Sequence, residues 1–142
     1  KDSSKSEKPI LLKSWENCTD LWYKKDDTFE RPKCIISMKL YTNDLLFSLK
    51  PETRVFAKLW CSMQKEYLRE FNYMAEEAKL NFNVSIKLDS VDFEWSGFND
   101  SMPNYISETL TRLQKMKDQD LKQIFSQSKE KLLLDLHNAY FE

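Results

Sequence analysis

Apolar residues recur at helical spacing over the longest patterned stretch of the chain, from Pro51 to Lys79. Side chains three and four residues apart lie on one side of an α-helix, and proline suits the first turn because its missing N–H needs no partner there. The pattern predicts one long amphipathic helix with an aromatic-rich stripe facing the core. The stripe consists of Phe56, Leu59, Trp60, Met63, Tyr67, Phe71, Met74 and Ala78.

Strict alternation of apolar and polar residues follows this helix. Apolar side chains occupy every second position from Phe82 to Leu88 and again from Val91 to Trp95, with Asp89 and Ser90 between the two runs. A period of two is typical of half-buried strands. The stretch predicts an antiparallel hairpin with one buried face, and we expect it to belong to the core of the sheet.

Less regular patterns precede the long helix. The aromatic and aliphatic residues between Ile10 and Asp27 predict a short strand that ends at a polar turn beginning at Lys24, and the stretch from Cys34 to Tyr41 predicts a second strand. Residues 1–8 are small and charged without any period, and we interpret them as a disordered or linker segment.

Two further helices are predicted in the last third of the chain. One begins near Pro103, and the other follows Asp118 or Asp120, either of which can cap its first turn. The order of strand, strand, helix, hairpin, helix, helix predicts an α+β domain in which helices pack on an antiparallel sheet. The expected inward residues are Ile106, Leu110, Leu113 and Met116 on the first helix and Leu121, Ile124, Phe125, Leu132, Leu133, Leu136 and Tyr140 on the second.

Composition excludes several classes of protein. The chain has one glycine, Gly97, where average usage predicts roughly ten, so the glycine-rich loops of Rossmann and P-loop nucleotide binders are ruled out. The 22 basic residues are balanced by 23 acidic ones, which gives no basic surplus for nucleic acid. No apolar run approaches the roughly 20 residues that span a bilayer, which excludes a membrane protein.

The cysteines and the first residues bear on the compartment. Cys18, Cys34 and Cys61 are odd in number and have no C-x-x-C spacing, whereas short secreted scaffolds carry more cysteines, in pairs. We therefore expect free thiols in a reducing compartment. No apolar signal segment follows Lys1, and together these features favour a cytoplasmic location for what we interpret as a piece of a longer protein.

Residue chemistry alone names no active site. His137 is the only histidine, whereas a catalytic zinc needs three protein ligands; His137 with Asp135 or Glu142 would bind weakly at best. Spacing neither supports nor forbids a pair of His137 with a cysteine, and no G-x-S-x-G elbow exists for a serine nucleophile. We predict no catalytic, cofactor-binding or metal-ligating residue in this chain.

Three segments nevertheless match a known pattern in order and spacing. Leu21 to Lys33 reads LWYKKDDTFERPK, Tyr67 to Leu80 reads YLREFNYMAEEAKL, and GFND at Gly97 is followed by Pro103. They resemble the patterns L-W-(aromatic)-K-x-D-D-x-F-x-x-P-K, Y-x-A-x-x-A-G-L and G-Y-N-D-x-x-P in the third domain of the insulysin and pitrilysin family of zinc metallopeptidases. The resemblance extends from about Pro9 to the C-terminus.

The resemblance implies a fold and a role. Members of this family have four related α+β domains in two halves that close around a peptide chamber, and only the first domain carries the zinc motif H-x-x-E-H. This chain has no such motif, and the helix from Pro51 contains no histidine, so no catalytic or metal residue is carried over. The glycine of the A-G-L pattern is Lys79 here, so the turn at this point must be built differently. Because the family's domains are longer, residues 9–142 are interpreted as the first part of a middle domain.

From the resemblance we expect a non-catalytic domain fragment of an insulinase-like zinc metalloendopeptidase. It would contribute chamber wall and substrate contacts, with the other domains of the parent peptidase and peptide substrates as partners, and with zinc held in the parent's catalytic domain. The chain alone is predicted to be inactive. A sheet left short exposes an edge and an apolar face, so self-association or strand swapping is expected. The alternative is a stand-alone protein-binding or scaffold domain that keeps the fold without peptidase activity.

Overall fold

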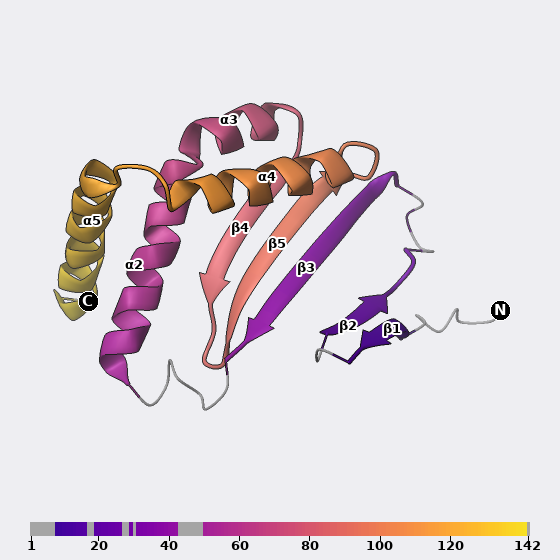
Figure 1. Cartoon of the computed structure of the whole chain (residues 1–142), viewed down its shortest axis with the longest axis horizontal. Helices are drawn as coiled ribbons and strands as arrows, with labels where there is room; N and C mark the ends of the chain where they lie inside the picture. The colour runs from indigo at the N-terminus through magenta and orange to yellow at the C-terminus, as the bar shows by residue number, and fades with distance from the viewer. Residues whose placement is uncertain (1–7, 17–18, 27–28, 30, 43–49, 142) are drawn as a thin grey trace. The chain divides into compact units, whose positions relative to one another are not determined.

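In the computed structural model the chain has two compact units, Lys1–Arg31 and Pro32–Glu142 (Figure 1). No described helix is both long enough and apolar enough to cross a bilayer. Of the segment predicted as a linker, only Lys8 is described, and it is exposed. The residues described are 8–16, 19–26, 29, 31–42 and 50–141, with side chains described as far as residue 138.

The first unit contains a two-stranded antiparallel sheet rather than one strand. β1 (Ile10–Trp15) pairs with β2 (Thr19–Tyr23), and the pairing places Ile10 opposite Tyr23 and Trp15 opposite Thr19. The single strand predicted between Ile10 and Asp27 is therefore wrong, because the chain reverses directly after Trp15. The predicted end of that stretch is confirmed, since β2 stops at Tyr23, just before the polar turn.

The second unit is built on a three-stranded antiparallel sheet. Its strands are β3 (Lys33–Tyr41), β4 (Asn81–Ile86) and β5 (Ser90–Phe98), in the order β3-β5-β4. The predicted strand at Cys34 and the predicted hairpin are both confirmed. The central strand is β5, which pairs with the whole of β3 on one side and with β4 on the other.

One face of this sheet forms the core. Val84, Phe93 and Trp95 are buried on it, as the alternation predicted, and the Phe93 ring lies 6.2 Å from Trp95 and 6.3 Å from Phe82 between centroids. Burying a large apolar side chain contributes roughly 1.5–3 kcal/mol, so this aromatic cluster is a main source of stability. Leu88, expected to face inward, lies in the turn between β4 and β5 and is exposed.

The long predicted helix is two helices. α2 (Pro51–Tyr67) and α3 (Arg69–Glu77) meet at Leu68, whose backbone leaves the helical conformation and whose side chain is 1 % exposed. Both α2 and α3 pack on β4 (Figure 1). Pro51 occupies the first turn of α2, as predicted.

The buried stripe of these two helices matches the predicted one only in part, since the half-buried members of the predicted stripe are Leu59, Met63, Tyr67 and Phe71. The buried stripe runs through Cys61, Gln64, Leu68 and Ala75, whereas the expected core residues Phe56, Trp60, Met74 and Ala78 are exposed. Apolar residues cover more than one side of this stretch, so their spacing alone does not select the buried side. At two of the four buried positions the side chains, Cys61 and Ala75, are small, which allows a helix to approach a sheet closely.

Lys79, which stands where the family pattern has glycine, lies just after the end of α3. Lys79 adopts a left-handed conformation with φ 60°, and its N–H donates to the carbonyl of Glu76 while the N–H of Leu80 donates to that of Ala75. These two bonds make a Schellman motif, in which glycine is the usual left-handed residue. The turn therefore has the backbone that a glycine would give, with a lysine in its place.

The remaining helices are α4 (Met102–Met116) and α5 (Lys122–Phe141). α4 packs on β5 and α5 on α2 (Figure 1). Before α5, the Asp120 carboxylate accepts a hydrogen bond from the Lys122 N–H, so Asp120 rather than Asp118 acts near the helix start. Tyr140, expected to face inward, lies outside the described side chains.

Burial on α4 and α5 matches the predicted faces in part. Met116 is buried on α4 and Ile106 and Leu113 are half-buried, but Leu110 is exposed. On α5 the side chains of Phe125, Leu133 and Leu136 are exposed, because this helix packs mainly on α2 and one neighbour covers only a narrow stripe. The α+β fold with helices on an antiparallel sheet is confirmed.

Candidate functional site

The first candidate site is a groove of about 480 Å³ beside β4, which we call the β4 groove. β4 pairs only with β5 among the described strands, so its other edge borders the groove with backbone groups that no strand engages. The apolar part of the lining comes from both the strand and α5, and lysines surround it. The lining residues are Lys58, Cys61, Ser62, Lys65, Val84, Ser85, Ile86, Lys131, Leu132, Asp135 and Leu136.

Cys61 is the only thiol in this groove, and its environment makes it unreactive. Burial disfavours the thiolate and raises the pKa of Cys61 from 9.0 to about 11, while the positive charge of Lys65 lowers it by a smaller amount. A thiol with such a pKa is protonated at neutral pH and is a poor nucleophile. Cys61 therefore acts as a small apolar residue of the core.

The groove does not suit a zinc ion. Cys61 and Asp135 line it, but a catalytic zinc needs three protein ligands, and the lysines at positions 58, 65 and 131 repel a dication. No three His, Cys, Asp or Glu side chains cluster anywhere in the described part of the chain. His137 lies on α5 and is exposed.

A second, smaller cavity of about 250 Å³ lies between α2 and α5, and we call it the α2–α5 pocket. It shares three residues with the β4 groove and adds four of its own. Arg69 forms an ion pair of 3.1 Å with Glu66 at its rim. The lining residues are Ser62, Lys65, Glu66, Arg69, Gln127, Ser128 and Lys131.

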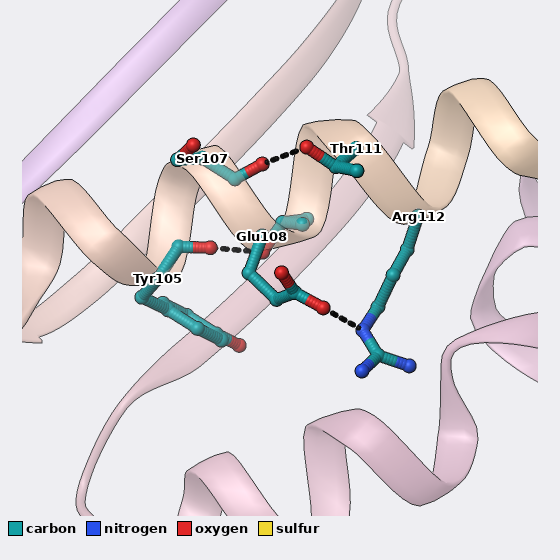
Figure 2. Close-up of polar contacts among 6 residues, drawn as sticks. Tyr105, Ser107, Glu108, Thr111 and Arg112 are labelled. Atoms are coloured by element: carbon teal, nitrogen blue, oxygen red, sulfur yellow. Dashed lines mark hydrogen bonds and ion pairs between the residues drawn. The ribbon is translucent and has the colours of Figure 1, made fainter.

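Polar contacts on α4 have a structural role instead (Figure 2). The Thr109 hydroxyl donates to the Tyr105 carbonyl at 2.7 Å, the Thr111 hydroxyl to the Ser107 carbonyl at 2.8 Å, and Arg112 pairs with Glu108 at 2.8 Å. Each contact joins residues four apart, so together they hold successive turns of one helix.

The same helix is joined to α3 by aromatic contacts. The Tyr105 ring stacks on Phe71 at 5.5 Å, the guanidinium of Arg112 lies 4.5 Å from the Phe71 ring centre, and the Tyr105 hydroxyl donates to Asn72. Burial, with a smaller effect of Glu76, raises the pKa of Tyr105 to about 12. Tyr105 is therefore a neutral packing residue rather than an acid or base at physiological pH.

Sequence reasoning did not find the residues that line the two cavities. Lys58, Ser62 and Lys65 are spaced by four and three residues, so they form a polar stripe along one side of a helix. The prediction of that helix rests on its apolar residues only. That spacing was the available signal. The contribution of α5 could not be read from the sequence, because it depends on which side of α5 meets α2.

Comparison with known proteins gives a consistent family. The model of the middle or third domain of peptidase M16 matches residues 1–142. The chain is 26% identical to insulin-degrading enzyme-like 2 of Arabidopsis thaliana over 107 residues, which are 75% of this chain and 11% of that protein. It is 28% identical to a nardilysin-like protein of the same plant over 106 residues, 75% of this chain and 10% of that protein. It is 25% identical to human insulin-degrading enzyme over 105 residues, 74% of this chain and 10% of that protein. The chain thus spans about a tenth of the length of these relatives.

Proposed function

Because the chain belongs to the peptidase M16 family, as part of its middle or third domain, we propose that it forms wall and substrate contacts of a peptide chamber. In this proposal the zinc and the residues that cleave the peptide bond lie in another domain of a larger metalloendopeptidase. The domain's partners are the other domains of that enzyme and the peptides it encloses. A cytoplasmic location is part of the proposal and is supported by the free thiols of Cys34 and Cys61.

The β4 groove is the observation that carries this proposal. An extended peptide can add a strand to an open sheet edge, with backbone hydrogen bonds giving affinity and neighbouring pockets giving preference for side chains. The groove places apolar side chains of α5, Leu132 and Leu136, beside the edge of β4. Lysines at its margin favour peptide segments that carry acidic residues.

The residues of the groove supply binding rather than bond cleavage. The Cys61 thiol is protonated at neutral pH, and the lysine-rich lining opposes zinc. Holding a peptide in a closed space raises its effective concentration at a catalytic centre elsewhere in the chamber. Contacts far from the scissile bond then act mainly on KM for peptides long enough to reach them.

The test compares two substitutions on α5 in the full-length peptidase. Leu136→Arg places a bulky cation in the groove, whereas Leu134→Arg, a similarly exposed position on the same helix that does not line the groove, serves as the matched control. L136R should raise KM severalfold for a long, unstructured peptide and leave cleavage of a short peptide unchanged, and L134R should change neither. Equal behaviour of the two variants would remove the groove from substrate binding.

The chain alone should not cleave a quenched fluorogenic peptide, with or without a zinc chelator. Chelator-sensitive turnover that follows the chain through purification would overturn the assignment of catalysis to another domain. The alternative role, a stand-alone binding or scaffold domain, requires that the chain occur without a peptidase domain that carries H-x-x-E-H. The open reading frame that encodes the chain distinguishes the two roles directly.

A further inference from the structure

The α2–α5 pocket has an excess of positive charge. Lys65, Arg69 and Lys131 line it, with Glu66 as the one carboxylate. Glu66 is engaged by Arg69, and neither Lys65 nor Lys131 has a carboxylate within 4.0 Å among the described residues. Like charges around one cavity repel each other, so an anion bound between them would be favourable.

A buried hydroxyl in the same pocket lacks a partner. Ser128 is 2 % exposed, and its hydroxyl oxygen has no hydrogen-bond partner in the structure. Buried polar groups are normally hydrogen-bonded, and an unpaired one needs an explanation. A bound group that accepts a hydrogen bond from Ser128 would explain the unpaired hydroxyl. The lysines beside Ser128 favour a group with negative charge.

We propose that the α2–α5 pocket binds a phosphate group. Phosphate oxygens accept charge-assisted hydrogen bonds from guanidinium and ammonium groups, and the four oxygens can engage donors from several directions at once. The pocket offers such donors from three helices: Lys65 from α2, Arg69 from the start of α3, and Lys131, Gln127 and Ser128 from α5. Water alone would satisfy the hydroxyl but would leave the positive charges uncompensated.

This site is distinct from the proposed peptide groove. Ser62, Lys65 and Lys131 line both cavities, but Arg69, Gln127 and Ser128 line the pocket only. Substitutions at Arg69 and Ser128 therefore test the phosphate site without changing the groove. The inference does not depend on the peptidase assignment, since it uses only the residues of this chain.

The experiment measures thermal unfolding and calorimetric binding of the chain in sodium phosphate against sodium chloride of equal ionic strength. Inorganic phosphate and phosphoserine are the two probes, which separate a free ion from a phosphate monoester. Arg69→Gln is the main variant, because the Arg69 side chain is 72% exposed and its loss should not disturb folding. Arg54→Gln, an exposed arginine of α2 outside the pocket, is the matched control.

We expect a saturable rise in the unfolding midpoint with phosphate but not with chloride. R69Q should weaken binding about tenfold, the usual effect of losing one charge-assisted hydrogen bond, and R54Q should bind like the wild type. S128A should also bind phosphate less tightly while unfolding at an equal or higher temperature in its absence, because an unpaired buried hydroxyl has been removed. The proposal is overturned if chloride stabilises as much as phosphate, or if R69Q and R54Q bind phosphate equally.

Discussion

Replacing Lys79 by glycine should stabilise the protein. Lys79 has φ 60°, and an L-residue with a Cβ loses roughly 1–2 kcal/mol in this left-handed region. Glycine avoids that strain, but it leaves the unfolded chain more conformational freedom than lysine does. The extra entropy lost on folding lowers the free energy of unfolding by up to about 1 kcal/mol. The exposed Lys79 side chain has no ion pair within 4.0 Å among the described residues, so little is lost with it. The net expectation for K79G is a gain of about 0.5–1 kcal/mol.

The assay is reversible urea unfolding followed by tryptophan fluorescence, with a thermal melt alongside. K79G should raise the melting temperature by about 2–4 °C. Lys79→Ala keeps a Cβ and should give no gain. Lys117→Gly is the matched control, because Lys117 also ends a helix but has φ −62°, where glycine should cost about 0.5–1 kcal/mol. A loss of stability in K79G equal to that in K117G would refute the argument from backbone strain.

Three other results are expected. Gly97→Ala should destabilise the fold by about 2 kcal/mol or more in the same urea assay, because the alanine Cβ would lie 2.6 Å from the Lys79 carbonyl oxygen and φ at this position is +147°. A G97A variant as stable as the wild type would contradict this. Cys61 should resist alkylation by iodoacetamide at pH 8, and the free energy of unfolding should fall by about 2 kcal/mol between pH 9 and 11. The reason is that the unfolded thiol ionises near pH 9, whereas the folded thiol stays protonated to about pH 11. The Cys61→Ala variant should lose less stability over this interval, and an equal loss would count against the buried thiol as the cause. The mass of the chain in analytical ultracentrifugation should rise with concentration, because Phe56, Trp60 and Ile35 are among its exposed apolar side chains, and a constant monomer mass would show the expected self-association to be wrong.

The sequence predicts those parts of this fold in which the spacing of apolar residues fits only one type of secondary structure and only one buried side. The two alternating runs, Phe82 to Leu88 and Val91 to Trp95, form the β4–β5 hairpin, and apart from Leu88 their apolar side chains lie on the buried or half-buried face. On the helix from Pro51, by contrast, apolar residues occur on more than one side. Which side is buried depends on how closely the helix approaches the sheet, and the spacing of Phe56 and Trp60 does not predict this.

The cavities were harder to predict than the fold, for a similar reason. The β4 groove and the α2–α5 pocket need α2 and α5 side by side, although Lys65 and Lys131 are far apart in the sequence. Their chemistry is carried by lysines and serines, which occur all over a charged surface and carry no motif. The αL turn at Lys79 was detectable only as a departure from a family pattern, since lysine gives no local signal for a positive φ.

The strand order has a consequence for how the chain folds as it is synthesised. β3 pairs only with β5 in the described sheet, so Tyr41 meets Ser90 across the sheet although α2, α3 and β4 separate them in the sequence. A ribosome therefore releases β3 long before its partner exists, whereas β4 and β5 emerge together and can close a short hairpin at once. β3 can pair only once β5 has emerged, so during synthesis β3 is the strand of this sheet that a chaperone would meet unpaired for longest.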